Sequence, residues 1–342
     1  MEENKKVVIS DVAKLAGVSK ATISRYLNGK FEYMSEKTRA RIEKSIKELN
    51  YRPNNIARSL KSNKSRLVGV IIADLTNPFS SIMIKGIGDM CKAKGYNMLI
   101  SNSDNDAKEE EDYIKSMMDQ RVEGIIVNGT GYNEELLLNI KNSGIPVVMV
   151  DRTLANESFD SVTSNNYDMT VETTNYLIDA GFDSLCFFNE RIDNVTPRRE
   201  REMAFLEVCR KRLKDENYNV SIVDYSKTGN LEISLCKFLN NYSGKKAIFA
   251  VNGVVLLNTL SAINKLNISI PKDLGICGYD NWGWASLISP GITTISQPSY
   301  EMGYESAKVL IDRLENESTL GTIHKQLSSK LEIRGSTIPL NM

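Results

Sequence analysis

Residues 11–28 read DVAKLAGVSKATISRYLN, and this stretch decides how the N-terminal part of the chain folds. Its first apolar residues recur at helical spacing, and Ser10 just before them is a predicted N-cap. Gly17 stops this helix, and Ser19 is placed to cap a second helix over residues 20–27, which ends at an Asn-Gly pair that tolerates left-handed backbone angles. The pattern predicts a helix, a tight glycine turn and a helix.

A third amphipathic helix is predicted over residues 35–50, because Ile42, Ile46 and Leu49 fall on one face and basic residues on the other. The three helices would enclose one small core. We therefore expect an all-α N-terminal domain at residues 1–52, followed by a connecting segment at residues 53–66.

The charge distribution separates this part from the rest of the chain. Residues 1–66 carry 16 basic and 7 acidic residues, a net charge of +9, whereas the remaining residues carry 27 basic and 36 acidic residues, a net charge of −9. A basic module of this size attracts a polyanion through counterion release, and the acidic remainder would be repelled by one. A merely solvated basic face is the alternative interpretation.

The bulk composition is that of a globular protein, with 41% hydrophobic and 25% charged residues among 342. No apolar run approaches the roughly 18 residues of a membrane helix. The start, MEENKKVVIS, lacks the features of a secretory signal, so a cytoplasmic protein is expected. The cysteines are five, widely spaced and without a C-x-x-C pair, which favours reduced and mostly buried thiols: Cys91, Cys186, Cys209, Cys236 and Cys277.

From residue 67 onward, short apolar runs alternate with amphipathic helical stretches, among them 109–120, 199–214 and 254–266. The first set of predicted strands is 68–73, 97–101, 124–128 and 147–151. After a crossing segment near residues 161–165, the second set is 185–189, 220–224, 247–251 and 275–279. This alternation is typical of βαβ units with parallel sheets, and two sets predict a two-lobed α/β domain over residues 67–342. Ligands of such sheets bind beyond the carboxyl ends of the strands, hence between the lobes.

The stretch 11–28 closely resembles the helix-turn-helix of the lactose and galactose repressor (LacI/GalR) family, with Gly at the turn and Ser at the start of the second helix. A helical hairpin that only builds a core would not require these residues. The resemblance implies that the second helix enters the major groove of DNA. The residues expected to read base edges are Lys20, Ala21 and Arg25. The residues expected to contact phosphates are Ser19, Thr22 and Asn28.

Residues 50–61, NYRPNNIARSLK, match the hinge segment of the same family. Pro53 would start a helix too short to be stable alone, so we expect it to fold only on DNA. The resemblance implies that two such helices, one from each subunit, enter the minor groove, with Asn54, Ala57 and Leu60 facing it and Leu60 acting as a wedge. An ordinary interdomain linker is the alternative.

The resemblance extends over essentially the whole chain, through DLTNPF at 74–79, VDR at 150–152, and GITTI at 291–295. The residues expected to bind an effector follow strand ends, or lie near them in the lobes: Phe79, Asn128, Asp151, Arg201, Asn252, Asp280 and Trp282. Arg201 is suited to a bidentate contact with a carboxylate, a phosphate or vicinal hydroxyls, and the aromatic rings are suited to a sugar face. A surface ion pair or a strand-end cap is the alternative for each polar residue. The pair Arg198-Arg199 would reinforce an anionic ligand or form a solvated face.

Two features depart from the common family pattern. Gly253 follows Asn252 where members usually carry an acidic residue, and residues 280–285, DNWGWA, are rich in aromatic side chains. Together with RYLNGKFEYM at 25–34, these features are similar to the branch that controls ketodeoxygluconate and related sugar-acid catabolism.

Catalysis is not expected. The single histidine, His324, lies in a polar stretch and excludes His-based metal clusters and triads. Gly86-Ile87-Gly88 falls inside a predicted helix, so it does not indicate a glycine-rich cofactor loop. Glu109-Glu110-Glu111 forms a charge run at a helix start, which suits the helix dipole rather than catalysis. No cofactor or metal is predicted.

The sequence thus predicts a homodimeric, sequence-specific DNA-binding regulator of carbohydrate catabolism, a repressor by resemblance, that binds a roughly palindromic operator. Its effector would be a small sugar, sugar acid or sugar phosphate, and no membrane is involved. Activation, either sign of the effector response and a tetramer remain compatible with the sequence. The rival hypotheses are a carbohydrate-binding protein without DNA function and a sugar-processing enzyme.

Overall fold

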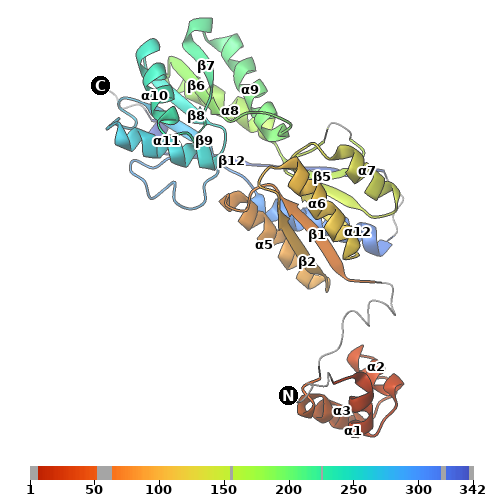
Figure 1. Ribbon diagram of the computed structural model, residues 1–342. Helices are drawn as coiled ribbons and strands as arrows, with labels where there is room; N and C mark the ends of the chain where they lie inside the picture. Colours follow the sequence, from red (N-terminus) through yellow and green to blue (C-terminus); the bar gives the residue numbers. More distant parts are fainter. Residues whose placement is uncertain (1–6, 52–63, 155–156, 225, 317–320, 339–342) are drawn as a thin grey trace. The chain divides into compact units, whose positions relative to one another are not determined.

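The computed structural model describes residues 7–51, 64–154, 157–224, 226–316 and 321–338 (Figure 1). The chain divides into two compact units, with the boundary between Ser65 and Arg66. Each unit is described by itself.

The N-terminal unit contains three helices, α1 (Ile9–Ala16), α2 (Lys20–Leu27) and α3 (Glu36–Glu48). Gly17 ends α1 with a φ of 61°, a left-handed conformation that favours glycine. Ser19 caps α2 as predicted, because its Oγ accepts from the Thr22 N–H at 3.1 Å. The helices pack around a small apolar core of Val12, Ala13, Ala16, Ile23 and Ile42.

The predicted start of α1 is wrong. Ser10 lies inside the helix, which begins at Ile9. The Asp11 carboxylate, in the first turn, accepts a hydrogen bond from the N–H of the N-cap residue Val8 at 2.9 Å. This bond stabilises the start of the helix in place of a serine cap.

The larger unit contains two six-stranded sheets. The first has the order β11-β5-β4-β3-β1-β2, and its strands are all parallel: β1 (Leu67–Ile72), β2 (Asn97–Asn102), β3 (Gly124–Asn128), β4 (Val147–Val150), β5 (Asp160–Ser164) and β11 (His324–Leu327). The second has the order β12-β10-β9-β8-β6-β7, and only its edge strand β12 is antiparallel: β6 (Ser184–Asn189), β7 (Tyr218–Ile222), β8 (Lys246–Ala250), β9 (Gly275–Tyr279), β10 (Thr293–Ser296) and β12 (Lys330–Glu332). The predicted fold class is therefore confirmed.

Helices accompany each sheet and, with it, form a lobe. The first lobe holds α5 (Pro78–Ala93), α6 (Ala107–Asp119), α7 (Glu134–Asn142) and α12 (Ser299–Asn316). The second lobe holds α8 (Asn166–Asp179), α9 (Thr196–Arg212), α10 (Asn230–Asn241) and α11 (Gly253–Lys265). The inner strands β3, β4, β6 and β9 are buried along their whole length, as expected for parallel strands that are covered on both faces.

The chain crosses between the lobes three times. The crossings lie between β5 and α8, between β10 and α12, and between β11 and β12, so each lobe is built from separate parts of the chain. The segment 161–165, predicted only as a crossing, is mostly the strand β5 of the first sheet. The stretch GITTI at 291–295, quoted for its family resemblance, contains most of strand β10 of the second sheet.

Helices α5 and α12 pack with their backbones nearly in contact. A Cβ at Gly86 would lie 2.1 Å from the Tyr300 carbonyl oxygen, and one at Gly303 would lie 1.9 Å from the Met83 carbonyl oxygen. Gly86 therefore serves helix packing inside α5, in agreement with its predicted helical position.

The charge run at residues 109–111 lies at the start of α6, as predicted, and one of its three carboxylates is buried. Glu110 is 1% exposed. Its carboxylate accepts from the Thr130 N–H at 2.6 Å, from the Thr130 hydroxyl at 3.0 Å and from Asn133 Nδ2 at 2.9 Å. Glu110 therefore braces the loop between β3 and α7.

The remaining side chains of note have structural roles. The five cysteines are free; four are buried and Cys236 is exposed. Burial raises the pKa of the Cys91 thiol to about 11, which makes it unreactive. His324 lies on β11, where its Nδ1 is 2.9 Å from Ser161 Oγ. Within the described residues, no helix is long and apolar enough to cross a membrane, and no group of side chains has the composition of a metal site.

Candidate functional sites

Helix α2 presents its predicted DNA-reading residues to solvent. Lys20, Ala21 and Arg25 are all exposed, whereas Ile23 between them is fully buried in the core. The hydroxyls of Ser19 and Thr22 lie 2.9 Å apart at the start of the helix, and Asn28 is exposed at its end. The geometry leaves one face of α2 available for a groove, and the individual base and phosphate contacts remain predictions.

The turn between α2 and α3 is held by aromatic contacts. The ring of Phe31 lies edge-on to Tyr26 with 5.7 Å between centroids, and the Arg39 guanidinium is 4.1 Å from the Phe31 centroid. The predicted hinge residues Asn54, Ala57 and Leu60 lie outside the described residues.

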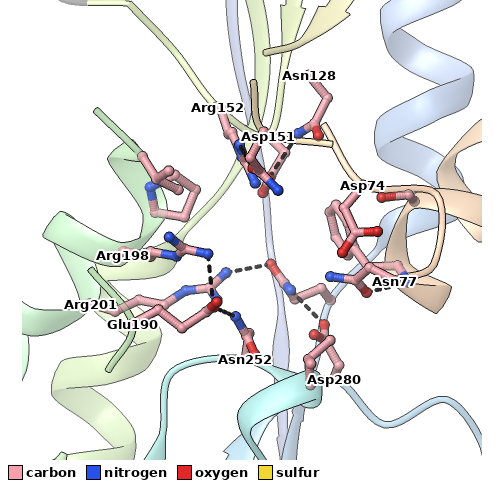
Figure 2. Close-up of a pocket in the computed structure, with 17 residues that line it drawn as sticks. Asp74, Asn77, Asn128, Asp151, Arg152, Glu190, Arg198, Arg201, Asn252 and Asp280 are labelled. Carbon is pink, nitrogen blue, oxygen red and sulfur yellow. Dashed lines mark hydrogen bonds and ion pairs between the residues drawn. The ribbon is translucent and has the colours of Figure 1, made fainter. Parts of the chain in front are cut away.

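The larger unit contains a cavity between its two lobes (Figure 2). It encloses about 670 Å³ that no protein atom fills, its open mouth included. Six of the seven predicted effector residues line it, namely Phe79, Asn128, Asp151, Arg201, Asn252 and Asp280. Arg198, for which the sequence left a ligand contact open, also lines the cavity. The other lining residues were not predicted as effector-binding: Asp74, Asn77, Ser80, Asn105, Arg152, Glu190, Val195, Pro197, Val254 and Gln297.

Strand ends position the polar side chains of this cavity. Asn128 is the last residue of β3, and Asp151 and Asp280 directly follow β4 and β9. Both aspartates have positive φ angles, 64° and 74°, so the chain turns sharply where the strand stops and presents the carboxylate. Asn128 Nδ2 donates to Asp151 Oδ2 at 3.1 Å. The expectation that ligand-facing groups follow strand ends therefore agrees with this geometry.

Arg201 is only 4% exposed, and its guanidinium is occupied by protein groups. Its Nη1 donates to the Val251 carbonyl at 2.7 Å, and its Nε and Nη2 donate to Asn166 Oδ1 at 3.0 and 2.7 Å. Its Nη2 also donates to Gln297 Oε1 at 2.9 Å. The Tyr279 ring centroid lies 3.6 Å from Cζ. Since four of the five N–H groups are engaged, this arrangement does not leave Arg201 two free parallel donors for a ligand.

Gln297 connects Arg201 to Asp280. Its Nε2 donates to Asp280 Oδ1 at 2.7 Å, and its Oε1 accepts from Arg201 and from the Ser164 hydroxyl at 3.0 Å. The other oxygen of Asp280 accepts from the Gly253 N–H at 3.0 Å. Gln297 follows β10, which is not among the strands predicted from the sequence, so its place at a strand end could not be recognised there.

Two further arginines lie on the cavity wall. Arg152 donates through Nη1 to Asn105 Oδ1 at 2.9 Å and to the Gly129 carbonyl at 3.1 Å. Arg198 donates through Nη1 to the Arg191 carbonyl at 2.7 Å, and its Nη2 lies 2.8 Å from Glu190 Oε2. Arg152 was quoted only as part of a motif, and Arg198 was left undecided between ligand and solvent.

Burial shifts the titration of three charged groups in the cavity. Burial raises the pKa of the Asp151 and Asp280 carboxyls, and the Arg201 charge opposes this rise in both cases. Burial lowers the pKa of the Arg152 guanidinium, while Asp151 opposes the fall. A further charge in this cavity would therefore interact strongly with these buried groups.

Trp282 does not line this cavity. It borders a second hollow formed with Asn281, Tyr300 and neighbouring residues. Its indole packs against Gly253, where an added Cβ would lie 2.4 Å from Cη2 of the ring. The predicted stacking of Trp282 on a sugar is therefore not supported by its position, because the ring fills the space that a side chain at position 253 would take.

Comparisons with known proteins agree with this architecture. Residues 8–54 match the family described as bacterial regulatory proteins, lacI family, and residues 68–318 match the periplasmic binding protein domain. The chain is 37% identical over 310 residues to the HTH-type transcriptional regulator KdgR of Bacillus subtilis, covering 90% of this chain and 91% of that protein. It is 34% identical over 336 residues to the regulator PtxS of Pseudomonas putida, covering 98% and 97%.

Solved structures share the fold. The lac repressor dimer bound to operator and the anti-inducer ONPF matches with a TM-score of 0.83 at 23% identity, covering 98% of this chain and 100% of that one. The transcriptional regulator CelR in complex with cellobiose matches with a TM-score of 0.68 at 23% identity, covering 96% and 99%. At these identities the likeness concerns the fold.

Proposed function

Because this chain belongs to the LacI family of bacterial regulatory proteins, we propose that an acidic sugar bound between its lobes controls its affinity for an operator. The chain is a DNA-binding transcriptional regulator of the helix-turn-helix type. Its relatives are regulators rather than enzymes, and we assign it no catalytic activity. The finer parts of the proposal concern the effector, the DNA contacts and the dimer.

The presence of Arg152 and Arg198 in the cavity wall is the observation that carries the effector class. Arg152 uses only Nη1 for protein contacts, and its Nε and Nη2 meet no acceptor within the described residues. These two nitrogens are the edge of a guanidinium that suits a bidentate carboxylate. A neutral sugar requires no such group, so we propose a sugar acid whose carboxylate binds Arg152 and is supported by Arg198.

Ketodeoxygluconate is the acid that we propose. The similarity to KdgR agrees with the branch indicated by the sequence. The hydroxyl groups of the acid would meet the short polar side chains of the cavity, among them Asn128, Asn252 and Asp280. Phe79, which is 6% exposed, would contribute an apolar edge. Genes of carbohydrate catabolism are the proposed targets.

We assign the DNA contacts as the sequence predicts them. Lys20, Ala21 and Arg25 would read base edges from the exposed face of α2. Residues 53–66 would form the hinge between a DNA-binding domain at 1–52 and an effector domain at 67–342, with Leu60 as the minor-groove wedge. Two copies of the chain, as in the lac repressor dimer, would bind a roughly palindromic operator.

Arg201 would couple the cavity to lobe movement instead of holding the carboxylate. Its two side-chain partners, Asn166 and Gln297, lie at two of the three crossings between the lobes. An effector that changes this network changes the balance between lobe arrangements, and a coupling free energy of about 1–3 kcal/mol is sufficient for regulation.

Operator binding in the presence of two matched compounds tests the proposal. One is ketodeoxygluconate, and the other is the neutral deoxyketose in which a hydroxymethyl group replaces the carboxylate. We expect the acid to change the operator Kd by roughly 5- to 150-fold and the neutral compound to leave it unchanged. Arg152→Met should abolish the response, whereas Arg199→Met, at an exposed position on α9, should keep it. A response to the neutral compound alone contradicts the assignment of a sugar acid.

A further inference from the structure

Glu190 has an unexpected position in the effector cavity. It directly follows β6, and its side chain is 15% exposed. Its Oε2 lies 2.8 Å from Arg198 Nη2 and accepts a hydrogen bond from Asn252 Nδ2 (Figure 2). One carboxylate oxygen is therefore shared by two donors that both face the cavity.

Both donors are also engaged by other protein groups. Asn252 uses its Oδ1 to cap α11 by accepting from the Val255 N–H at 2.9 Å, so its amide nitrogen is its remaining polar group. Arg198 uses Nη1 for the Arg191 carbonyl at 2.7 Å. Glu190 thus occupies Nη2 of Arg198 and Nδ2 of Asn252, two donors that could otherwise bind an anion.

The charges around the cavity give this arrangement a consequence. The lining contains four carboxylates and three guanidiniums: Asp74, Asp151, Glu190 and Asp280, with Arg152, Arg198 and Arg201. Glu190 also acts on Arg152, since it is among the acidic groups that oppose the fall in the pKa of Arg152 caused by burial. An entering carboxylate therefore meets two arginines whose field Glu190 already neutralises in part.

We propose that Glu190 is an internal competitor of the effector carboxylate: the acid binds Arg152, and it must displace Glu190 before Arg198 and Asn252 can contact it as well. This inference rests on the proposed function and deepens it. The exchange replaces one charge-assisted contact of Arg198 with another. Arg198 therefore contributes less binding free energy to an acid than an arginine without a carboxylate partner would contribute. Glu190 would thereby set the concentration of sugar acid to which the regulator responds. It would have little influence on a neutral sugar.

Titration calorimetry on the full chain tests the inference. We compare ketodeoxygluconate with the neutral deoxyketose for wild type, Glu190→Gln and the control Glu202→Gln. Glu202 lies on α9 outside the cavity lining and accepts from Asn189 Nδ2 at 2.7 Å. Glu190→Gln keeps an acceptor for one donor but removes the charge. We expect it to lower the Kd for the acid at least tenfold and to change the Kd for the neutral compound less than twofold. Glu202→Gln should change neither.

An unchanged or raised Kd for the acid in Glu190→Gln overturns the inference, because the carboxylate would then be neutral toward the ligand or help to bind it. If Glu190→Gln does not fold, Glu190→Asp provides the same test. Its carboxylate is one methylene shorter and withdraws from Arg198, so the Kd for the acid should fall at least threefold. If the wild-type protein binds only the neutral compound, the proposed sugar-acid effector is contradicted. This result comes from wild type alone, so it is distinguished from a failure of the Glu190 inference.

Discussion

Replacing Arg201 with methionine tests whether this arginine holds the lobes of the larger unit or faces the ligand. The change removes donors from the Val251 carbonyl, Asn166 and Gln297 and takes a cation from the face of Tyr279. An unsatisfied buried acceptor costs about 1–3 kcal/mol, and a desolvated cation–π contact contributes about 2 kcal/mol. Part of this loss is offset, because the buried guanidinium no longer has to be desolvated and the Ser164 hydroxyl still reaches Gln297. We therefore expect the free energy of unfolding to fall by about 3 kcal/mol.

Urea unfolding followed by tryptophan fluorescence measures the free energy of unfolding of the larger structural unit, in which Arg201 lies. The chain has two tryptophans, Trp282 and Trp284, and both lie in the unit that begins at Arg66. The unfolding midpoint should fall while the slope with urea stays the same, since the surface exposed on unfolding is unchanged. The control Arg199→Met should stay within about 0.5 kcal/mol of wild type, because it replaces an exposed arginine. A loss below about 1 kcal/mol for Arg201→Met would refute the reasoning and return Arg201 to the ligand-binding residues.

Three further predictions concern the other sites. Ser19→Ala removes the cap from the Thr22 N–H and should weaken operator binding about fivefold, for a cap worth about 1 kcal/mol; an unchanged Kd in a gel-shift assay contradicts this. Asp151→Asn should raise the free energy of unfolding at pH 7, because burial raises the pKa of the carboxyl and stability falls as pH rises through that pKa. The difference in free energy of unfolding between Asp151→Asn and wild type should shrink as the pH falls toward 3.8, the ordinary pKa of an aspartate. A difference that stays constant with pH in urea titrations contradicts a raised pKa of Asp151. Thr196→Val removes the hydroxyl that accepts from the Thr153 N–H of the other lobe at 2.9 Å. The lobes should then open more often, and the radius of gyration from X-ray scattering should rise. Scattering curves identical to those of wild type would show that this contact does not hold the lobes closed.

The strands that the sequence predicted well share one property. Inner parallel strands such as β3, Gly124–Asn128, are buried on both faces and appear in the sequence as short apolar runs. Strands β11 and β12 read HKQL and KLE, lie at sheet edges and remain partly exposed, so hydrophobicity alone does not reveal them. Their pairing is set by the crossings between the lobes, which periodicity cannot predict.

The candidate site was predicted at the level of residues and not of contacts. Topology correctly indicated strand ends, and six of seven residues line one cavity. The sequence could not show that the guanidinium of Arg201 is already engaged by Asn166 and Gln297. These acceptors are distant from Arg201 along the chain, and they follow β5 and β10, which were not predicted as strands. Gly253 and Trp282 looked like two separate departures from the family. In the structure they are one packed pair, since the indole occupies the space that the missing side chain leaves.

The three crossings between the lobes have a consequence for the order of events on the ribosome. The first lobe starts with β1 at Leu67, but its helix α12 spans Ser299–Asn316 and its edge strand β11 ends at Leu327. Buried residues of α12, among them Met302 and Leu310, belong to the same core as Val68 and Val70 of β1. The nascent first lobe therefore cannot complete its interior until almost the whole chain has been synthesised, although it is begun first. The second lobe at that stage lacks the short strand β12 and the buried turn at Gly335–Thr337. The last residues translated thus finish both halves together, so the larger unit matures as a single event at the end of synthesis.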